Sequence, residues 1–429
     1  MILLYAFFPL SVPVSVQAGR GGVEEDIGGN AEDQPIILAA GLKVEQVVEG
    51  LELPTSMAFV GPNDFLVLEK QRGTVKRVVD DRLLQHPVLD VSVANENERG
   101  MLGVIVEKEI DGMSNGNSNR YVFLMFTESD EDGSDDCSSS ITCKQEGSPI
   151  GNRLYRYELV KSELINPELL LDLPGTPGPA HNGGALITGL DNHIYVTIGD
   201  VRCACTQAAN IQDGGQPDGR AGILRLTSDG EPVPEGALIG EVDPLYFYYA
   251  YGIRNSFGIA FDPVTGKLWD TENGAGENDE INLVEPGFNS GYKWIQGIAK
   301  NKQDISLLED FAGRGKYSDP EFVWTKVVGP TAVTFLDSNR LGQQYANDMF
   351  VGDVHRGNLY HFELNEERTQ LILKGPLEDR VANDDEQLEG VIFGRNFGGI
   401  SDLEVGPDGY LYIVSIGQGK IYRIIPEDR

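Results

Sequence analysis

The sequence is poor in basic residues, in histidine and in cysteine. Its 429 residues include 34 Lys and Arg against 67 Asp and Glu, which gives a formal net charge of −33. A surface of this sign repels nucleic-acid phosphates and anionic lipid headgroups. We therefore predict no nucleic-acid partner and no docking on anionic membranes. Only five histidines and four cysteines occur, so the place of each one is informative.

Several chemistry-bearing motifs are also absent. No glycine-rich phosphate loop lies between a strand and a helix, and neither a G-x-S-x-G nor an H-E-x-x-H pattern is present. These absences argue against a P-loop nucleotide enzyme, a serine hydrolase of the elbow type and a zincin. Beyond the N-terminus, no stretch approaches the ~18 consecutive apolar residues that a membrane helix needs. We therefore predict no membrane span.

The N-terminus is apolar and ends in small residues. Residues 1–18 resemble a secretory signal segment with cleavage after Ala18, although a basic n-region is missing. Residues 19–35 are polar and glycine-rich, as in a flexible linker. We predict a secreted, periplasmic or cell-surface protein whose folded part is one domain over residues 36–429.

The four cysteines form two close pairs, Cys137/Cys143 and Cys203/Cys205. An even number in an exported chain favours disulfides. A bond between Cys203 and Cys205 would close a very small ring, so we predict two bonds between the pairs, each joining one of Cys137/Cys143 to one of Cys203/Cys205. Two local bonds, or free thiols in a chain that is not exported, are the alternatives.

What is abundant is glycine, with 52 residues, and short apolar runs at regular spacing. Six segments repeat one pattern of apolar strand, turn, strand, loop and strand, beginning with residues 56–78 and ending with residues 400–424. Repeats of this size indicate a propeller. We predict an all-β fold, a six-bladed β-propeller of four-stranded antiparallel blades. An early strand around residues 42–50 completes the last blade.

His181 lies in a glycine-rich loop, "GPAHNGGAL", just before an apolar strand. A neutral imidazole suits proton transfer near neutral pH. The hypothesis is a general base at the mouth of a cavity, and the alternative is a loop histidine without a task.

Five segments together resemble one family, the soluble quinoprotein glucose dehydrogenases, also called glucose/sorbosone or aldose sugar dehydrogenases. They are "ERGMLGV", "HNGG", "GIRNSFGIAFDPVTGKLW", "DEINLVEPGFNSGY" and "VGPDGYLYIVS". The resemblance runs from about Leu42 to Ile425. It implies a six-bladed propeller with pyrroloquinoline quinone (PQQ) and calcium on its axis.

The resemblance assigns roles to individual residues. His181 matches the catalytic base, and Arg254 and Asn255 match quinone-binding residues, Arg254 also stabilising charge on the reduced cofactor. Gly274 and Ala275 match a Gly-Pro pair whose carbonyls hold the calcium beside the quinone.

Three further positions match family sites. Glu280 matches a ligand of a structural calcium, Thr331 lies in a cofactor-contacting stretch, and His355 stands where the family supplies a lysine.

The sequence departs from the family where cations are needed. Gly399 and Ser401 occupy the positions of two arginines that face the quinone carboxylates. PQQ has three carboxylates and requires several cations in a buried site. Besides Arg254, the candidates are Arg356 and Arg99.

The function predicted from these matches is oxidation of the anomeric carbon of an aldose sugar or oligosaccharide to a lactone. PQQ and calcium serve as cofactors, and electrons pass to an external acceptor. A calcium-stabilised, quinone-free propeller that binds a sugar or a protein is the main alternative, and a calcium-dependent lactonase is another.

Overall fold

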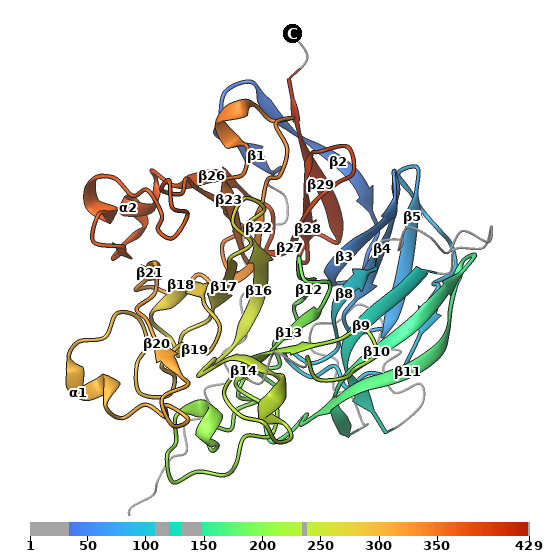
Figure 1. Ribbon diagram of the computed structural model, residues 1–429. Coiled ribbons are helices and arrows are strands. Elements are labelled where there is room, and N and C mark those ends of the chain that lie inside the picture. The colour runs from blue at the N-terminus through green and yellow to red at the C-terminus, as the bar shows by residue number, and fades with distance from the viewer. Residues whose placement is uncertain (1–33, 108–119, 131–147, 234–237, 428–429) are drawn as a thin grey trace, which may run out of the picture.

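The computed structural model describes residues 34–107, 120–130, 148–233 and 238–427, and strands dominate this part of the chain (Figure 1). The predicted signal segment lies outside the described residues, as does most of the predicted linker. No helix of the described residues is long and apolar enough to cross a membrane.

The strands form six sheets around a common axis. Each sheet has one innermost strand, next to the axis, and Figure 1 shows these six strands around the centre. They are β3 (Pro54–Gly61), β8 (Met101–Val106), β12 (Leu186–Thr188), β16 (Ser256–Phe261), β22 (Pro330–Phe335) and β27 (Ile400–Val405). Each contacts the next, and β27 contacts β3, so the ring is closed.

The sheets continue outward from these strands. The β3 sheet adds β4 (Asp64–Glu69), β5 (Thr74–Val79), β6 (Arg82–Leu83) and β7 (Leu89–Asp90). The β8 sheet adds β9 (Arg120–Ser129), β10 (Pro149–Val160) and β11 (Glu163–Leu173). The β12 sheet adds β13 (Ile194–Ile198), β14 (Gly222–Leu226), β15 (Tyr248–Tyr251), β19 (Phe288–Asn289) and β20 (Lys316–Tyr317).

The other half of the ring is built in the same way. The β16 sheet adds β17 (Leu268–Glu272), β18 (Asp279–Val284), β21 (Phe322–Trp324) and β25 (Val381–Ala382). The β22 sheet adds β23 (Met349–Asp353), β24 (Leu359–Phe362), β26 (Ile392–Arg395) and β1 (Ile36–Ile37). The β27 sheet adds β28 (Leu411–Ser415), β29 (Lys420–Pro426) and β2 (Leu42–Glu49). Helices are short, as in α1 (Lys302–Ile305), α2 (Asp385–Leu388) and the 3₁₀ turns Gln207–Ala209, Leu245–Phe247, Gln343–Tyr345 and Gly375–Leu377.

The prediction of an all-β propeller is confirmed, but the prediction of six blades with four antiparallel strands each is wrong. Only two of the sheets have four strands, and the pairings β15–β19, β19–β20 and β21–β25 are parallel. The long connections after β18 and β24 supply these short extra strands, which cover outer edges that would otherwise be unpaired. The prediction for the early strand is confirmed, because β2 pairs with β29 from Leu42–Pro426 to Glu49–Lys420.

In each sheet, the strand that pairs with the innermost one is covered on both faces by the adjacent sheets. Strands β13 (IYVTI) and β28 (LYIVS) are buried at every residue, which explains their unbroken apolar runs. Strands β17 (LWDTE) and β23 (MFVGD) are equally buried, yet they carry the carboxyl groups of Asp270, Glu272 and Asp353. Buried carboxyl groups are costly unless they are protonated or neutralised.

The cysteine prediction is wrong, because Cys203 and Cys205 are bonded to each other. A tight turn brings their Cα atoms to 5.1 Å. In it the Cys203 N–H donates to the Asp200 carbonyl and the Cys205 N–H donates to the Cys203 carbonyl, both at 2.8 Å. Cys137 and Cys143 lie outside the described residues.

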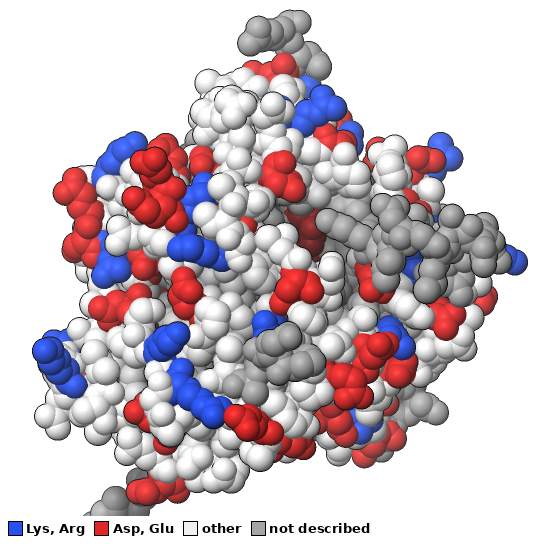
Figure 2. Space-filling view, in the orientation of Figure 1, with Lys and Arg blue, Asp and Glu red and all other residues white. Residues whose placement is uncertain are grey.

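The surface reflects the acidic composition. Acidic side chains are spread over most of the face in Figure 2, with basic side chains between them.

Candidate active site

A cavity of about 2670 Å³ follows the axis of the ring and is lined by residues of all six first strands. The structure brings most of the predicted site residues to this cavity: His181, Arg254, Asn255, Gly274, Thr331 and His355. Ala275 and Glu280 do not line the cavity, and Glu280 is buried on strand β18 of the β16 sheet.

His181 is held from both ring nitrogens. Its Nδ1 lies 2.5 Å from Oδ1 of Asp200, and its Nε2 lies 2.8 Å from a terminal nitrogen of Arg254. A guanidinium has donors only, so Nε2 must be the acceptor and the ring proton must be on Nδ1, directed at Asp200. A protonated ring would bring two cationic donors face to face. This arrangement suits the neutral tautomer, with the Nε2 lone pair directed at Arg254.

The backbone around His181 is unusual. His181 has φ +65°, and Val201, whose N–H donates to the His181 carbonyl at 3.1 Å, has φ +50°. Positive φ at a β-branched residue is a rare conformation, and such outliers cluster at functional sites. Gly183, at φ +62°, lies so close to Thr197 and Ile198 that a side chain has no room there.

Arg254 is fixed by its own backbone and by a neighbouring loop. Its N–H donates to Glu272 at 2.6 Å, and its Nη1 donates to the Asn273 carbonyl at 2.7 Å. Its buried Nε has no hydrogen-bond partner among the described residues. The guanidinium is thus positioned beside His181.

Glu98 joins His181 to Asn255. Its carboxylate accepts the His181 N–H at 2.5 Å and the side-chain amide of Asn255 at 3.1 Å. The buried Oδ1 of Asn255 has no partner in the described part of the chain. Asn255 and Arg254, which both line the cavity, thus each carry one buried polar atom without a partner among the described residues.

The Gly274 loop is tied to the next sheet by Asp279. The Asp279 carboxylate accepts the Gly274, Val328 and Gly329 N–H groups at 2.8, 2.7 and 2.9 Å. A Cβ at residue 274 would overlap the Glu277 carbonyl, so only glycine fits there. Asp279 therefore sets the Gly274 loop against the segment that leads to Thr331.

Glu280 belongs to a buried group of acids on one face of strands β17 and β18. It lies opposite Glu272, and Asp270 lies opposite Asn282. Burial raises the pKa of Glu280 and of Asp270 well above their usual values, and it raises the pKa of Glu272 to about 7. Both Asp270 oxygens and Oδ1 of Asn282 lack partners among the described residues.

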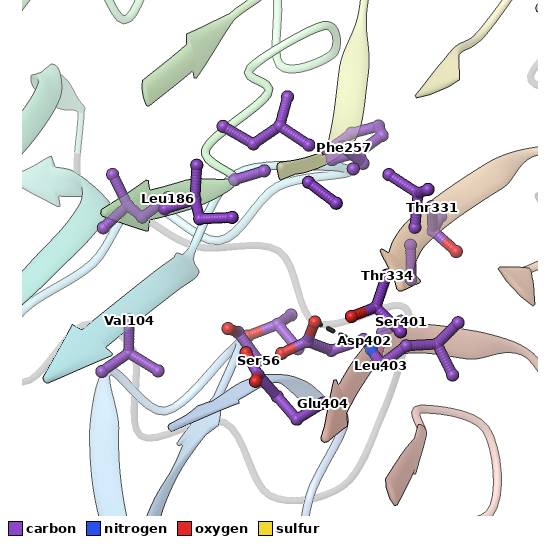
Figure 3. A pocket seen from close by; sticks show the side chains of 18 of the residues that line it. Ser56, Val104, Leu186, Phe257, Thr331, Thr334, Ser401, Asp402, Leu403 and Glu404 are labelled. Atoms are coloured by element: carbon purple, nitrogen blue, oxygen red, sulfur yellow. Dashed lines mark hydrogen bonds between the residues drawn. The ribbon is translucent and has the colours of Figure 1, made fainter. Parts of the chain in front are cut away.

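The opposite wall of the cavity has no cation in place of the family arginines. Ser401 donates to the Pro54 carbonyl at 2.8 Å, and Oδ2 of Asp402 accepts the Met57 N–H at 2.8 Å. Figure 3 shows Ser56, Asp402 and Glu404 together on one side of the cavity and Leu186 and Phe257 across from them.

The two other arginines proposed from the sequence do not line the cavity. Arg99 is buried and donates to the Gly175 and Gly178 carbonyls at 2.6 and 3.0 Å, so it holds the loop that precedes His181. Arg356 pairs with Asp385 at 2.7 Å. The Lys and Arg residues that line the cavity, besides Arg254, are Lys70, Arg120, Arg202 and Arg340.

Comparison with known proteins identifies the family. The family model for glucose/sorbosone dehydrogenases matches residues 51–423. The chain belongs to the glucose/sorbosone dehydrogenase family. It is 23% identical over 394 residues to the aldose sugar dehydrogenase YliI of Escherichia coli, covering 91% of this chain and 94% of that protein.

Other members are related over different lengths. Quinoprotein glucose dehydrogenase B of Acinetobacter calcoaceticus is 27% identical over 271 residues, which are 58% of this chain and 52% of that protein. The PQQ-bound aldose sugar dehydrogenase of Streptomyces coelicolor has the same fold, with a TM-score of 0.60 at 21% identity over 91% of this chain and 99% of that one.

Within this family site, sequence reasoning missed Asp200, Glu98, Asp279 and Tyr292. Asp200 directly follows the apolar strand β13, and an acid at the end of a buried strand was the signal that could have found it. The hydroxyl of Tyr292 reaches Asp200 from 92 positions away, and Asp279 contacts Val328 and Gly329 about 50 positions on, so spacing along the chain gives no hint of these contacts.

Proposed function

We propose that this member of the family is an exported dehydrogenase that oxidises the anomeric carbon of aldose sugars or oligosaccharides to lactones. The observation that carries the proposal is the placement of His181 between Asp200 and Arg254 on the wall of a large axial cavity. An aldose that donates its anomeric hydroxyl to Nε2 would meet a neutral base of the correct tautomer. Such a positioned base is worth about 10²–10⁴-fold in rate.

His181 and Arg254 divide the work. His181 takes the hydroxyl proton at Nε2, and Asp200 stabilises the imidazolium that forms, while its bond to Nδ1 keeps the ring in orientation. Arg254 gives up its contact to Nε2 when the substrate enters, and its guanidinium then faces the oxygen that gains negative charge. Its bond to the Asn273 carbonyl keeps it in place during this exchange.

The cofactor assignment rests on the unpartnered groups near His181. The free Nε donor of Arg254 and the free Oδ1 acceptor of Asn255 fit the polar edge of a quinone. PQQ, when bound, supplies the hydride acceptor. We propose Arg254, Asn255 and Thr331 as its contacts, with His355 in the place of the family lysine.

Calcium is proposed at two places. The carbonyls of Gly274 and Ala275 would hold one ion beside the cofactor, where oxygen ligands suit a hard cation. Among the described residues, no group of three or more His, Cys, Asp or Glu side chains is arranged to hold a metal. For a second ion, the support is the group of buried carboxyls around Glu280, where oxygens of Asp270 and Asn282 have no partner among the described residues.

Export is supported by two features. One is the signal-like N-terminus, and the other is the Cys203–Cys205 bond, which is typical of oxidising compartments.

The test is reconstitution. Purified protein receives PQQ and Ca²⁺, and dye reduction is followed with a panel of aldoses and with oligosaccharides. Turnover that needs PQQ, Ca²⁺ and an aldose supports the proposal. No turnover with any sugar, together with an unchanged PQQ absorption spectrum, would overturn it.

A quinone-free sugar- or protein-binding propeller is the second candidate. Two observations favour it: Ser401 stands in place of an arginine, and the Glu98 carboxylate lies next to Asn255 at the proposed quinone site. Sugar binding by calorimetry without any PQQ affinity would select this alternative.

A further inference from the structure

Only 1% of the surface of Asp200 is exposed, and both of its carboxylate oxygens have partners. Oδ1 contacts Nδ1 of His181 and accepts the Arg202 N–H at 3.0 Å. Oδ2 accepts the hydroxyl of Tyr292 at 3.1 Å. The carboxylate that orients His181 is thus itself oriented from its far side by a phenol.

Tyr292 reaches Asp200 from a distant part of the chain and is held firmly. Its N–H donates to the Gly252 carbonyl at 3.1 Å, and its carbonyl accepts the side-chain amide of Asn210 at 2.5 Å. The next residue, Lys293, donates its N–H to the Ala209 carbonyl at 3.0 Å. Because the backbone is fixed on both sides, the hydroxyl of Tyr292 has little freedom to leave Asp200.

We infer that Tyr292 is a positioning residue of the proton-transfer site, acting on His181 through Asp200. This inference rests on the proposed role of His181 as base. The hydroxyl withdraws negative charge from the carboxylate and keeps it in one rotamer. Both effects set how strongly Asp200 attracts a proton on the His181 ring.

The other charged groups around this chain of contacts are few. Arg254 faces Nε2 of His181, Glu98 faces its backbone N–H, and Glu272 lies on the far side of Arg254. Burial, and then the nearness of Asp200, raises the pKa of Tyr292 above its usual value, so the phenol stays protonated as a donor at physiological pH. Tyr292 is therefore a neutral donor to the buried carboxylate of Asp200.

The test compares Tyr292→Phe with Tyr251→Phe. Tyr251 is a buried tyrosine of the same hydrophobic cluster whose hydroxyl donates to the Glu309 carbonyl at 2.5 Å, away from Asp200. The ring nitrogens of histidine are labelled with ¹⁵N, and the signal that His181→Gln removes is followed from pH 4 to pH 9. The same variants are assayed for kcat and KM over that pH range with PQQ, Ca²⁺ and an aldose.

Loss of the hydroxyl leaves Asp200 more strongly negative, so the protonated ring gains stability. We expect the midpoint of the His181 titration to move up by about 0.5 pH unit in Tyr292→Phe and to stay unchanged in Tyr251→Phe. In the assay, the acid limb should move by the same amount, and kcat should fall about threefold at neutral pH with little change in KM. Equal midpoints in the wild type and both variants would overturn the inference.

Two features keep the result decisive. The NMR midpoint is read without turnover, so an inactive wild type would overturn the proposed function and still leave the role of Tyr292 tested. If Tyr292→Phe fails to fold, 3-fluorotyrosine is incorporated into the wild type, because its more acidic hydroxyl is a stronger donor. The midpoint must then move down, and an unchanged midpoint would count against Tyr292.

Discussion

The two walls of the axial cavity use their polar groups differently. On the first wall, His181, Arg254 and Asn255 are linked through Asp200 and Glu98, yet one buried donor and one buried acceptor have no partner among the described residues. On the second wall, the side chains of Ser401 and Asp402 form hydrogen bonds with the backbone of strand β3.

The difference means that proton transfer depends on the first wall, whereas binding of an anionic cofactor depends also on the second. Proton transfer needs a base, its orienting acid and a cation at the developing charge, and the first wall holds an imidazole, a carboxylate and a guanidinium that we propose for these roles. Binding a tricarboxylate needs further cations, and the second wall supplies carboxylates instead. The base site can therefore be intact while cofactor affinity is low, and the predictions below test the two walls separately.

The largest effect is expected at the first wall. His181→Gln should lower kcat by about 100-fold or more while the protein stays folded, because glutamine cannot take the proton at Nε2. The matched control is His361→Gln, since His361 also pairs with an acid, Asp348 at 2.8 Å, but lies outside the cavity. Equal kcat values for the two variants would show that His181 is not the base.

Removal of calcium is expected to come next. A chelator should lower the melting temperature, because an ion bound only by the folded state at 100 times its Kd contributes about 2.7 kcal/mol. In Glu280→Gln, Ca²⁺ should raise the melting temperature much less than it does in the wild type. Melting curves that are the same with chelator and with Ca²⁺ would contradict calcium binding, and a full rise in the variant would place the ion elsewhere.

Much of the first wall was predictable from the sequence, because His181, Arg254 and Asn255 stand in short motifs that each follow or precede an apolar strand. The propeller was predictable for the same reason, since the repeated apolar strands appear directly in the chain. The number of strands per sheet was not, because β19, β20 and β25 are two-residue pairings that leave no periodic pattern.

Contacts between residues far apart in the sequence could not be predicted. Tyr292 and Asp200 are 92 positions apart, and nothing at either position announces the other. For Cys203 and Cys205 the error concerned a local contact. Their bond was not predicted because it closes a small ring, but the turn after Asp200 brings their Cα atoms to 5.1 Å. Local backbone conformation, with Val201 and Arg202 both at positive φ, decided the pairing.

A smaller effect is expected at Asp353, which is fully buried at the end of β23, near the second wall. Burial raises the pKa of Asp353 to about 7. The native state then holds a proton that the unfolded chain releases near pH 4, so stability falls as the pH rises toward 7. From pH 5 to pH 7 the free energy of unfolding should drop by roughly 2 kcal/mol more in the wild type than in Asp353→Asn.

Urea unfolding at several pH values, with chelator present to exclude calcium effects, measures this slope. The slope is attributable to Asp353 because the carboxylate accepts the Arg356 and Gly357 N–H groups and the Tyr360 hydroxyl, and asparagine can keep at least the first two. Parallel stability curves for wild type and variant would place the titrating group elsewhere.

The smallest effect is a gain at the second wall. Ser401→Arg adds a cation where the family carries one, and a single charge-assisted bond to a quinone carboxylate should raise PQQ affinity by about tenfold, or ~1.4 kcal/mol. Ser401→Leu is the control for bulk and for loss of the bond to the Pro54 carbonyl. Affinities are measured by fluorescence titration at low and high salt, since a charge effect must weaken as salt rises. If arginine and leucine bind PQQ equally well, the missing cation is not what limits cofactor binding, and Asp402 and Glu404 become the groups to neutralise.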